Sequence, residues 1–159
     1  MMRGNIALIA VGFLLLCPIG SVFSADVGGE DAKKELQKFQ GTWVMVSGEM
    51  DGKKPADDHV KQSKILYEGN KIQIVVPNQA SETIVADIVK IDPTRNHKEM
   101  HFVRKNGHNA GKTLIGIYEF EGDGQYRFAF DPAGKGTLTE FVTKAGTGHV
   151  RNTWKRVKP

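Results

Sequence analysis

The chain has 159 residues, of which 40% are hydrophobic and 25% are charged, and its formal net charge at pH 7 is +4. This length allows one domain and excludes a TIM barrel or a dinucleotide-binding enzyme with a separate substrate domain. The hydrophobic fraction excludes an intrinsically disordered chain, and the 18 glycines follow no collagen-like repeat.

Residues 1–24 have the three regions of a secretory signal peptide. A short polar start carries Arg3, residues 6–16 are apolar apart from one glycine, and small or aliphatic side chains lead up to Ser24. An apolar run of this length is too short to span a bilayer. We therefore expect cleavage after Ser24, export to the periplasm or beyond the cell, and no integral membrane segment after cleavage.

The single cysteine, Cys17, lies inside this signal, so the mature chain is expected to carry no disulfide. Residues 25–30 are predicted to form a flexible leader, and residues 31–159 one domain. The basic residues near the C-terminus are interpreted as solvated side chains on a strand, because nucleic-acid modules are usually more basic. No nucleic-acid partner is therefore expected.

A short amphipathic helix is predicted over residues 31–39, because Ala32, Leu36 and Phe39 share one face and Asp31 is placed to cap it. From Trp43 onward the pattern becomes that of β-structure, interrupted by one helical turn within residues 55–61. Strands are predicted over residues 43–50, 64–67, 71–76, 83–91, 99–104, 113–121, 125–131, 139–143 and 150–157.

Nearly all connections between these eight or nine strands are short enough to join antiparallel neighbours. We therefore predict an all-β fold, an up-and-down antiparallel β-barrel of eight or nine strands, preceded by the short helix. Closure into a barrel removes the exposed edges that an open meander of this size would have.

The alternation of side chains places large apolar residues on the inner face of the barrel. An eight-stranded barrel is either filled by its own side chains or holds one small ligand, and the sequence leaves both alternatives open. The candidate ligand-binding residues are Ile74, Met100, Phe102, Tyr118, Phe120, Tyr126, Phe128, Phe130 and Trp154.

His97, Glu99 and His101 are candidate metal ligands, because their spacing puts three ligand-type side chains on one face of a strand. The preferred interpretation is a solvated strand, so no metal site and no cofactor are expected. No serine of the mature chain lies in a Gly-x-Ser-x-Gly motif. We predict no catalytic residues and no enzymatic activity.

Gly41, Thr42 and Trp43 begin the first strand directly after the predicted helix. This motif resembles the Gly-x-Trp opening of the calycin superfamily, which includes lipocalins, fatty-acid-binding proteins and avidins. The resemblance implies that the tryptophan closes one end of the barrel and packs against a basic residue of the last strand. Lys155 and Arg156 are the candidate partners, and with Trp43 they form the predicted structural latch.

A closer resemblance covers nearly all of residues 36–158. Its motifs are Leu36-Gln37-x-x-Gln40-Gly41-Thr42-Trp43, Asp51-Gly52-Lys53, Gly116-Ile117-Tyr118-Glu119, Phe141, Gly148-His149-Val150 and Lys155-Arg156-Val157. They resemble an exported, lipocalin-like domain of unknown function that is abundant in planctomycetes. The chain departs from that pattern at Leu138-Thr139-Glu140, where the family often has Arg-Pro before the phenylalanine. The resemblance therefore implies a fold more than an activity.

Together these features predict an exported, non-catalytic lipocalin-like protein that binds a small apolar ligand inside its barrel. The alternative is a plugged barrel that acts as an interaction module, or as a protease-inhibitor-like protein, through loops such as residues 106–111 and 134–136. Its partner would then be a protein. A metal-dependent enzyme using His97, Glu99 and His101 is the third hypothesis.

Overall fold

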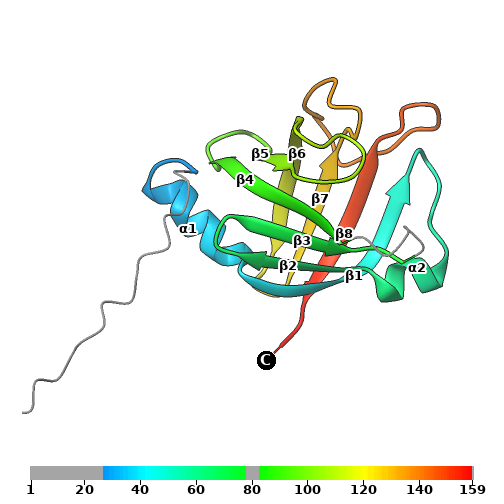
Figure 1. Cartoon of the computed structure of the whole chain (residues 1–159), viewed down its shortest axis with the longest axis horizontal. Coiled ribbons are helices and arrows are strands. Elements are labelled where there is room, and N and C mark those ends of the chain that lie inside the picture. The colour runs from blue at the N-terminus through cyan, green and yellow to red at the C-terminus, as the bar shows by residue number, and fades with distance from the viewer. Residues whose placement is uncertain (1–26, 78–82, 159) are drawn as a thin grey trace, which may run out of the picture.

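A computed structural model of the chain describes residues 27–77 and 83–158. The predicted signal peptide, residues 1–24, lies outside these ranges, as does the beginning of the predicted leader. Figure 1 shows a strongly curved sheet that closes on itself, with one helix against its end and a second, shorter helix at the opposite end. Within the described ranges, no helix is long and apolar enough to cross a membrane.

Within residues 27–77 and 83–158, eight strands and two helices follow one another along the chain. In order they are α1 (Glu30–Phe39), β1 (Gly41–Met50), α2 (Asp57–Gln62), β2 (Lys64–Glu68), β3 (Lys71–Val75), β4 (Ile84–Asp92), β5 (Lys98–Arg104), β6 (Thr113–Glu121), β7 (Gln125–Phe130) and β8 (Val150–Arg156).

Each strand pairs antiparallel with the next one, and β8 returns to β1 to close the barrel. Trp43 lies opposite Arg156 at one end of this closing pair, and Met50 lies opposite Val150 at the other end. The predicted all-β, up-and-down barrel with a preceding helix is confirmed, and its strand number is eight.

The predicted ninth strand over residues 139–143 was wrong, because these residues adopt no strand conformation. The sheet closes through β7, β8 and β1, which leaves no free edge for another strand there. Phe141 instead packs on the outer face of the barrel against Ile117 and Ala129. Phe141 is thus buried by its contacts with the outer face of the barrel, and it is not part of a strand.

The helix α1 lies against one end of the barrel because its apolar stripe is buried there. Ala32, Leu36 and Phe39 are all buried, as the spacing predicted, and Phe39 has no exposed surface. Its N-cap is Gly29, without a side-chain cap, and not the predicted Asp31. Before the helix, the carbonyl of the buried Val27 accepts a hydrogen bond from Ile91, which holds the described part of the leader against β4.

The two ends of the barrel are built differently. At the end that carries α1, which we call the α1 end, short connections join β2 to β3, β4 to β5, and β6 to β7. At the opposite end, which we call the distal end, long connections span residues 51–63, 105–112 and 131–149. The helix α2 belongs to the first of these long connections (Figure 1).

Candidate functional site

A small cavity of about 60 Å³ lies inside the barrel. Among the described residues, seven of the nine predicted ligand-binding residues line it, together with four further residues. The predicted ones are Ile74, Met100, Phe102, Tyr126, Phe128, Phe130 and Trp154, and the further ones are Ile65, Tyr67, Ile72 and Asn152. Most of the barrel interior is therefore filled by side chains, and the remaining space is predominantly apolar.

Tyr118 and Phe120 do not line this cavity, although they lie on the inner face of β6. Phe39 of α1 occupies their end of the barrel, with its ring centroid 4.9 Å from that of Tyr118 and 4.8 Å from that of Phe120. These two predicted residues thus belong to the packing of the α1 end.

One glycine decides how Phe128 sits in the wall. Gly116 of β6 lies directly opposite Phe130, and a Cβ atom at Gly116 would come within 2.0 Å of the Phe128 ring. The ring can therefore lie against the β6 backbone only because residue 116 has no side chain. The ring of Phe128, packed in this way, forms part of the cavity wall.

Tyr67 and Tyr126 contribute the hydroxyl groups of the cavity wall. The two hydroxyl oxygens are 2.9 Å apart and share a hydrogen bond. Burial raises the pKa of both phenols well above the usual value, so both remain neutral at ordinary pH. The other polar side chain of the wall is the amide of Asn152, which faces inward between Val150 and Trp154 on β8.

The tryptophan latch uses Arg156. Its guanidinium carbon lies 4.2 Å from the centroid of the Trp43 ring, and its nitrogens donate hydrogen bonds to the carbonyls of Lys38, Gln40 and Asp123. The Trp43 indole nitrogen donates to the carbonyl of Phe39 at 2.6 Å. Arg156 of β8 thereby contacts the end of α1, Trp43 of β1 and the β6–β7 turn.

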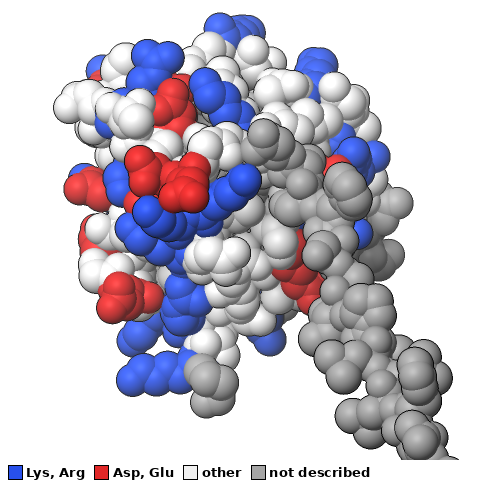
Figure 2. Space-filling model, turned by 90° about the vertical axis from the view of Figure 1, so that its left-hand side faces the viewer, with Lys and Arg blue, Asp and Glu red and all other residues white. Residues whose placement is uncertain are grey.

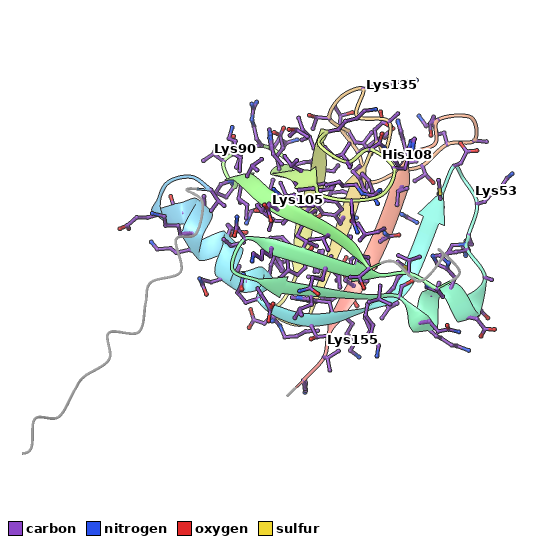
Figure 3. The ribbon with its side chains drawn as sticks, viewed as in Figure 1. Lys53, Lys90, Lys105, His108, Lys135 and Lys155 are labelled. Atoms are coloured by element: carbon purple, nitrogen blue, oxygen red, sulfur yellow. The ribbon has the colours of Figure 1, made fainter. Side chains whose placement is uncertain are left out.

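Lys155, the other candidate for the latch, is not part of it. It pairs with Val44 and Gln125 on the outer face of the barrel, and its side chain extends away from the sheet (Figure 3). The reason is the two-residue period of β8, because Trp154 points inward and its immediate neighbour must then point outward.

Of the three candidate metal ligands, Glu99 and His101 lie on the outside of β5 and His97 directly precedes this strand, but the three side chains do not converge. Nε2 of His101 is 3.2 Å from a carboxylate oxygen of Glu99, whereas the His97 ring packs edge-on against Phe141. Arg95 lies 3.9 Å from the other Glu99 oxygen. In the part of the chain that the structure describes, no three histidine, cysteine or carboxylate side chains are grouped to hold a metal ion.

Charges on the α1 end are paired closely. Glu35 is only 6% exposed, and it accepts hydrogen bonds from Lys38 at 2.7 Å, from Lys98 at 2.9 Å and from the Tyr118 hydroxyl at 3.3 Å. Burial alone would raise the pKa of this carboxyl, but the two lysines outweigh it and hold the pKa below its usual range. Figure 2 shows acidic and basic side chains side by side on this face.

A larger groove lies outside the barrel, between the second half of β1 and α2. Its volume is about 670 Å³. Val46, which lies at an irregularity in the pairing of β1 with β8, is 43% exposed on its wall. Lys54, Lys61 and Arg151 also contribute to the wall, which makes it partly basic.

In comparisons with known proteins, no family model, no curated protein and no solved structure matches this chain.

Proposed function

We propose that this chain is an exported, non-catalytic, lipocalin-like protein that binds a small and largely apolar molecule inside its barrel. The observation that carries the proposal is the internal cavity of about 60 Å³, walled by aromatic and aliphatic side chains with two hydroxyls and one amide. Small-molecule sites in proteins combine an apolar lining with a few fixed polar groups in this way.

The size of the cavity limits the class of ligand. Drug-sized ligands occupy pockets of about 300–1,000 Å³, which is much more than the barrel offers. A cavity of 60 Å³ nevertheless exceeds the space that one water molecule needs, which is about 10–15 Å³. We therefore propose a ligand that inserts a short aliphatic chain or a single ring.

The packing also indicates the direction of access. Phe39, Trp43 and Arg156 fill and cover the α1 end, and the first two are fully buried. Ile74 and Phe130 of the cavity wall lie near the distal ends of their strands and are only partly buried. The ligand is thus proposed to enter from the distal end.

Native mass spectrometry with hexan-1-ol and toluene tests this function. Both probes are expected to saturate at one molecule per chain. Ile74→Trp should abolish binding by filling the entrance, whereas Val75→Trp should not, because Val75 is the neighbouring residue and is 49% exposed on the outer face. Failure of every probe on the folded chain, or equal binding by both variants, would contradict the proposal.

Export is a separate part of the proposal, and it rests on the signal-like pattern of residues 1–24. The N-terminal residue of the chain recovered from the periplasm or the medium is expected to be Ala25. Recovery of the chain inside the cell with Met1 in place would contradict it.

The groove between β1 and α2 favours a second candidate, an interaction module with a filled barrel. The groove is far larger than the internal cavity, and it exposes Val46 to solvent. A photo-crosslinking residue at position 46 would then capture a stoichiometric protein partner, whereas one at Val142, which is 45% exposed elsewhere, would not. Equal capture at both positions would remove this candidate.

A further inference from the structure

Arg104 is the last residue of β5, two positions beyond Phe102 of the cavity wall. Residues two apart on a strand share a face, so Arg104 starts from the inner side of the barrel. Its partner across the sheet supports this placement, because Arg104 lies opposite Ala86, which is 1% exposed and in turn lies opposite Ile72 of the cavity wall. The side chain of Arg104 therefore starts at the distal end of the barrel interior, beyond the residues that line the cavity.

Within the described residues, the guanidinium of Arg104 has no ion-pair or hydrogen-bond partner that would satisfy its buried Nε atom. Nε of Arg104 is buried and has no hydrogen-bond acceptor within residues 27–77 and 83–158. No carboxylate in those ranges forms an ion pair with it, whereas Arg127 and Arg151 each pair with a glutamate. A buried donor without an acceptor is uncommon in proteins, so Nε of this partly buried arginine calls for a partner that the described chain does not supply.

The side chain of Arg104 is partly buried, and the chain packs closely around it. Burial lowers the pKa of Arg104 from its usual value, which means that the environment disfavours its charge. The loop after β5 passes close by, since a Cβ atom at Gly107 would lie 3.2 Å from Nη2 of Arg104. The neighbouring Lys105 lies on the outer face, where it pairs with Asp87 at 2.7 Å.

We propose that Arg104 binds the carboxylate of a small amphiphile whose apolar part occupies the barrel cavity. The inference rests on the proposed function and adds the charge of the ligand. A carboxylate matches the planar fork of a guanidinium and can accept two parallel hydrogen bonds. The order of the groups along β5 fits such a molecule, because Met100 and Phe102 line the apolar cavity and the cation follows toward the distal end.

Titration calorimetry with hexanoate and hexan-1-ol tests the contribution of the ligand's negative charge separately from binding of its aliphatic chain in the cavity. The two probes have the same aliphatic chain and differ only in the head group. We expect hexanoate to bind the chain at least tenfold more tightly than hexan-1-ol. Arg104→Gln should remove this preference by weakening hexanoate about tenfold or more, and it should leave hexan-1-ol within twofold.

Lys105→Gln is the matched control, because it removes the same charge from the adjacent outward-facing residue. It should leave the affinity for both probes unchanged. Arg104→Lys should retain part of the preference for hexanoate, since the charge remains and the planar fork is lost. An equal effect of Arg104→Gln and Lys105→Gln on hexanoate would overturn the proposal, because it would indicate a general charge effect.

Two further outcomes separate this inference from the proposed function. Equal affinity of the unmodified chain for hexanoate and hexan-1-ol overturns the role of Arg104 but leaves the binding cavity in place. Failure of both probes overturns both proposals.

Inorganic phosphate should compete poorly with hexanoate, and competition at equal concentration would contradict an amphiphilic ligand. Thermal unfolding should show that Arg104→Gln is at least as stable as the unmodified chain, and a lower Tm with unchanged binding would assign Arg104 a structural role instead.

Discussion

Each end of this barrel carries an inward-facing arginine, and the two arginines differ in their hydrogen-bond partners. At the α1 end, Arg156 lies over Trp43 and donates hydrogen bonds to three carbonyls. At the distal end, Nε of Arg104 is buried without an acceptor in the described ranges. The first arginine completes the packing of its own protein, whereas the second lacks a partner there. The chain itself thus supplies the contacts of the arginine at the closed α1 end. It does not do so, within the described ranges, for the arginine at the distal end, where we propose that a ligand binds.

The difference extends to the aromatic residues. Phe39 contacts the rings of Tyr67, Tyr118, Phe120 and Tyr126 at centroid distances of 4.8 to 5.2 Å. Nearer the distal end, Phe102, Phe128 and Phe130 contact one another at 5.7 to 6.0 Å and border the cavity. The α1 end is therefore expected to carry most of the stability, and the distal end to tolerate change.

Phe39→Ala should give the largest loss of stability. It removes a fully buried ring that touches four other rings, and such substitutions cost about 3–5 kcal/mol. Urea unfolding followed by tryptophan fluorescence measures the effect. Val142→Ala, at an exposed site, should change the unfolding free energy by less than about 0.5 kcal/mol. A loss below 1 kcal/mol for Phe39→Ala would show that α1 does not hold this end.

Arg156→Gln should come next. It removes the cation over Trp43 and the hydrogen bonds to the Lys38 and Gln40 carbonyls, which together are worth about 2 kcal/mol. Lys155→Gln removes the same charge from the neighbouring outward side chain and should cost less than about 0.5 kcal/mol. Equal unfolding midpoints for the two variants would contradict the assignment of the latch to Arg156.

Glu35→Gln should lower stability by about 1–2 kcal/mol near neutral pH, because Glu35 accepts hydrogen bonds from two lysines. The pKa of Glu35 is lower in the folded state than in the unfolded state. Its stabilising effect is thus present above the usual carboxyl pKa and is lost as the pH falls through the folded-state value. Unfolding between pH 7 and pH 3 should show the two proteins converging in stability at acidic pH. A constant difference across this range would contradict the pairing.

Arg104→Gln should change the free energy of unfolding least. Unlike Arg156→Gln, it should not lower this free energy. It removes a partly buried charge whose buried Nε has no acceptor within the described ranges, so the free energy of unfolding should stay constant or rise by up to about 1 kcal/mol. The same urea titration measures it. A loss comparable to that of Arg156→Gln would abolish the distinction between the two ends.

Much of the fold could be predicted from side-chain alternation alone. Tyr126, Phe128 and Phe130 alternate with polar or small residues on β7, and the inner face follows from that period. The segment at residues 139–143 has a similar local pattern, but its apolar residue Phe141 is buried against the outer face. Local pattern gives no information on which face of the barrel a buried residue contacts.

The prediction of the candidate site was only partly right, because alternation leaves a second feature of each residue undetermined. Alternation assigns a residue to the inner face but does not give its level along the barrel axis, so Tyr118 and Phe120 were grouped with the cavity residues. Asn152 and Arg104 were missed because a search for apolar alternation passes over polar residues at inward positions. The period of β5, in which Met100 and Phe102 precede Arg104, was the available signal for the arginine.

The burial of Phe141 on the outside of the barrel has a consequence for local opening. Ile117 and Ala129, which pair across β6 and β7, are covered by Phe141 on the outer face, while Tyr118 and Phe128 beside them face the interior. This stretch of sheet is shielded from water on both sides, unlike the β2–β3 hairpin, where Leu66 and Gln73 are only partly buried. Amide protons of β6 and β7 should thus be the slowest in the barrel to exchange with solvent, and these two strands its last unit to unfold.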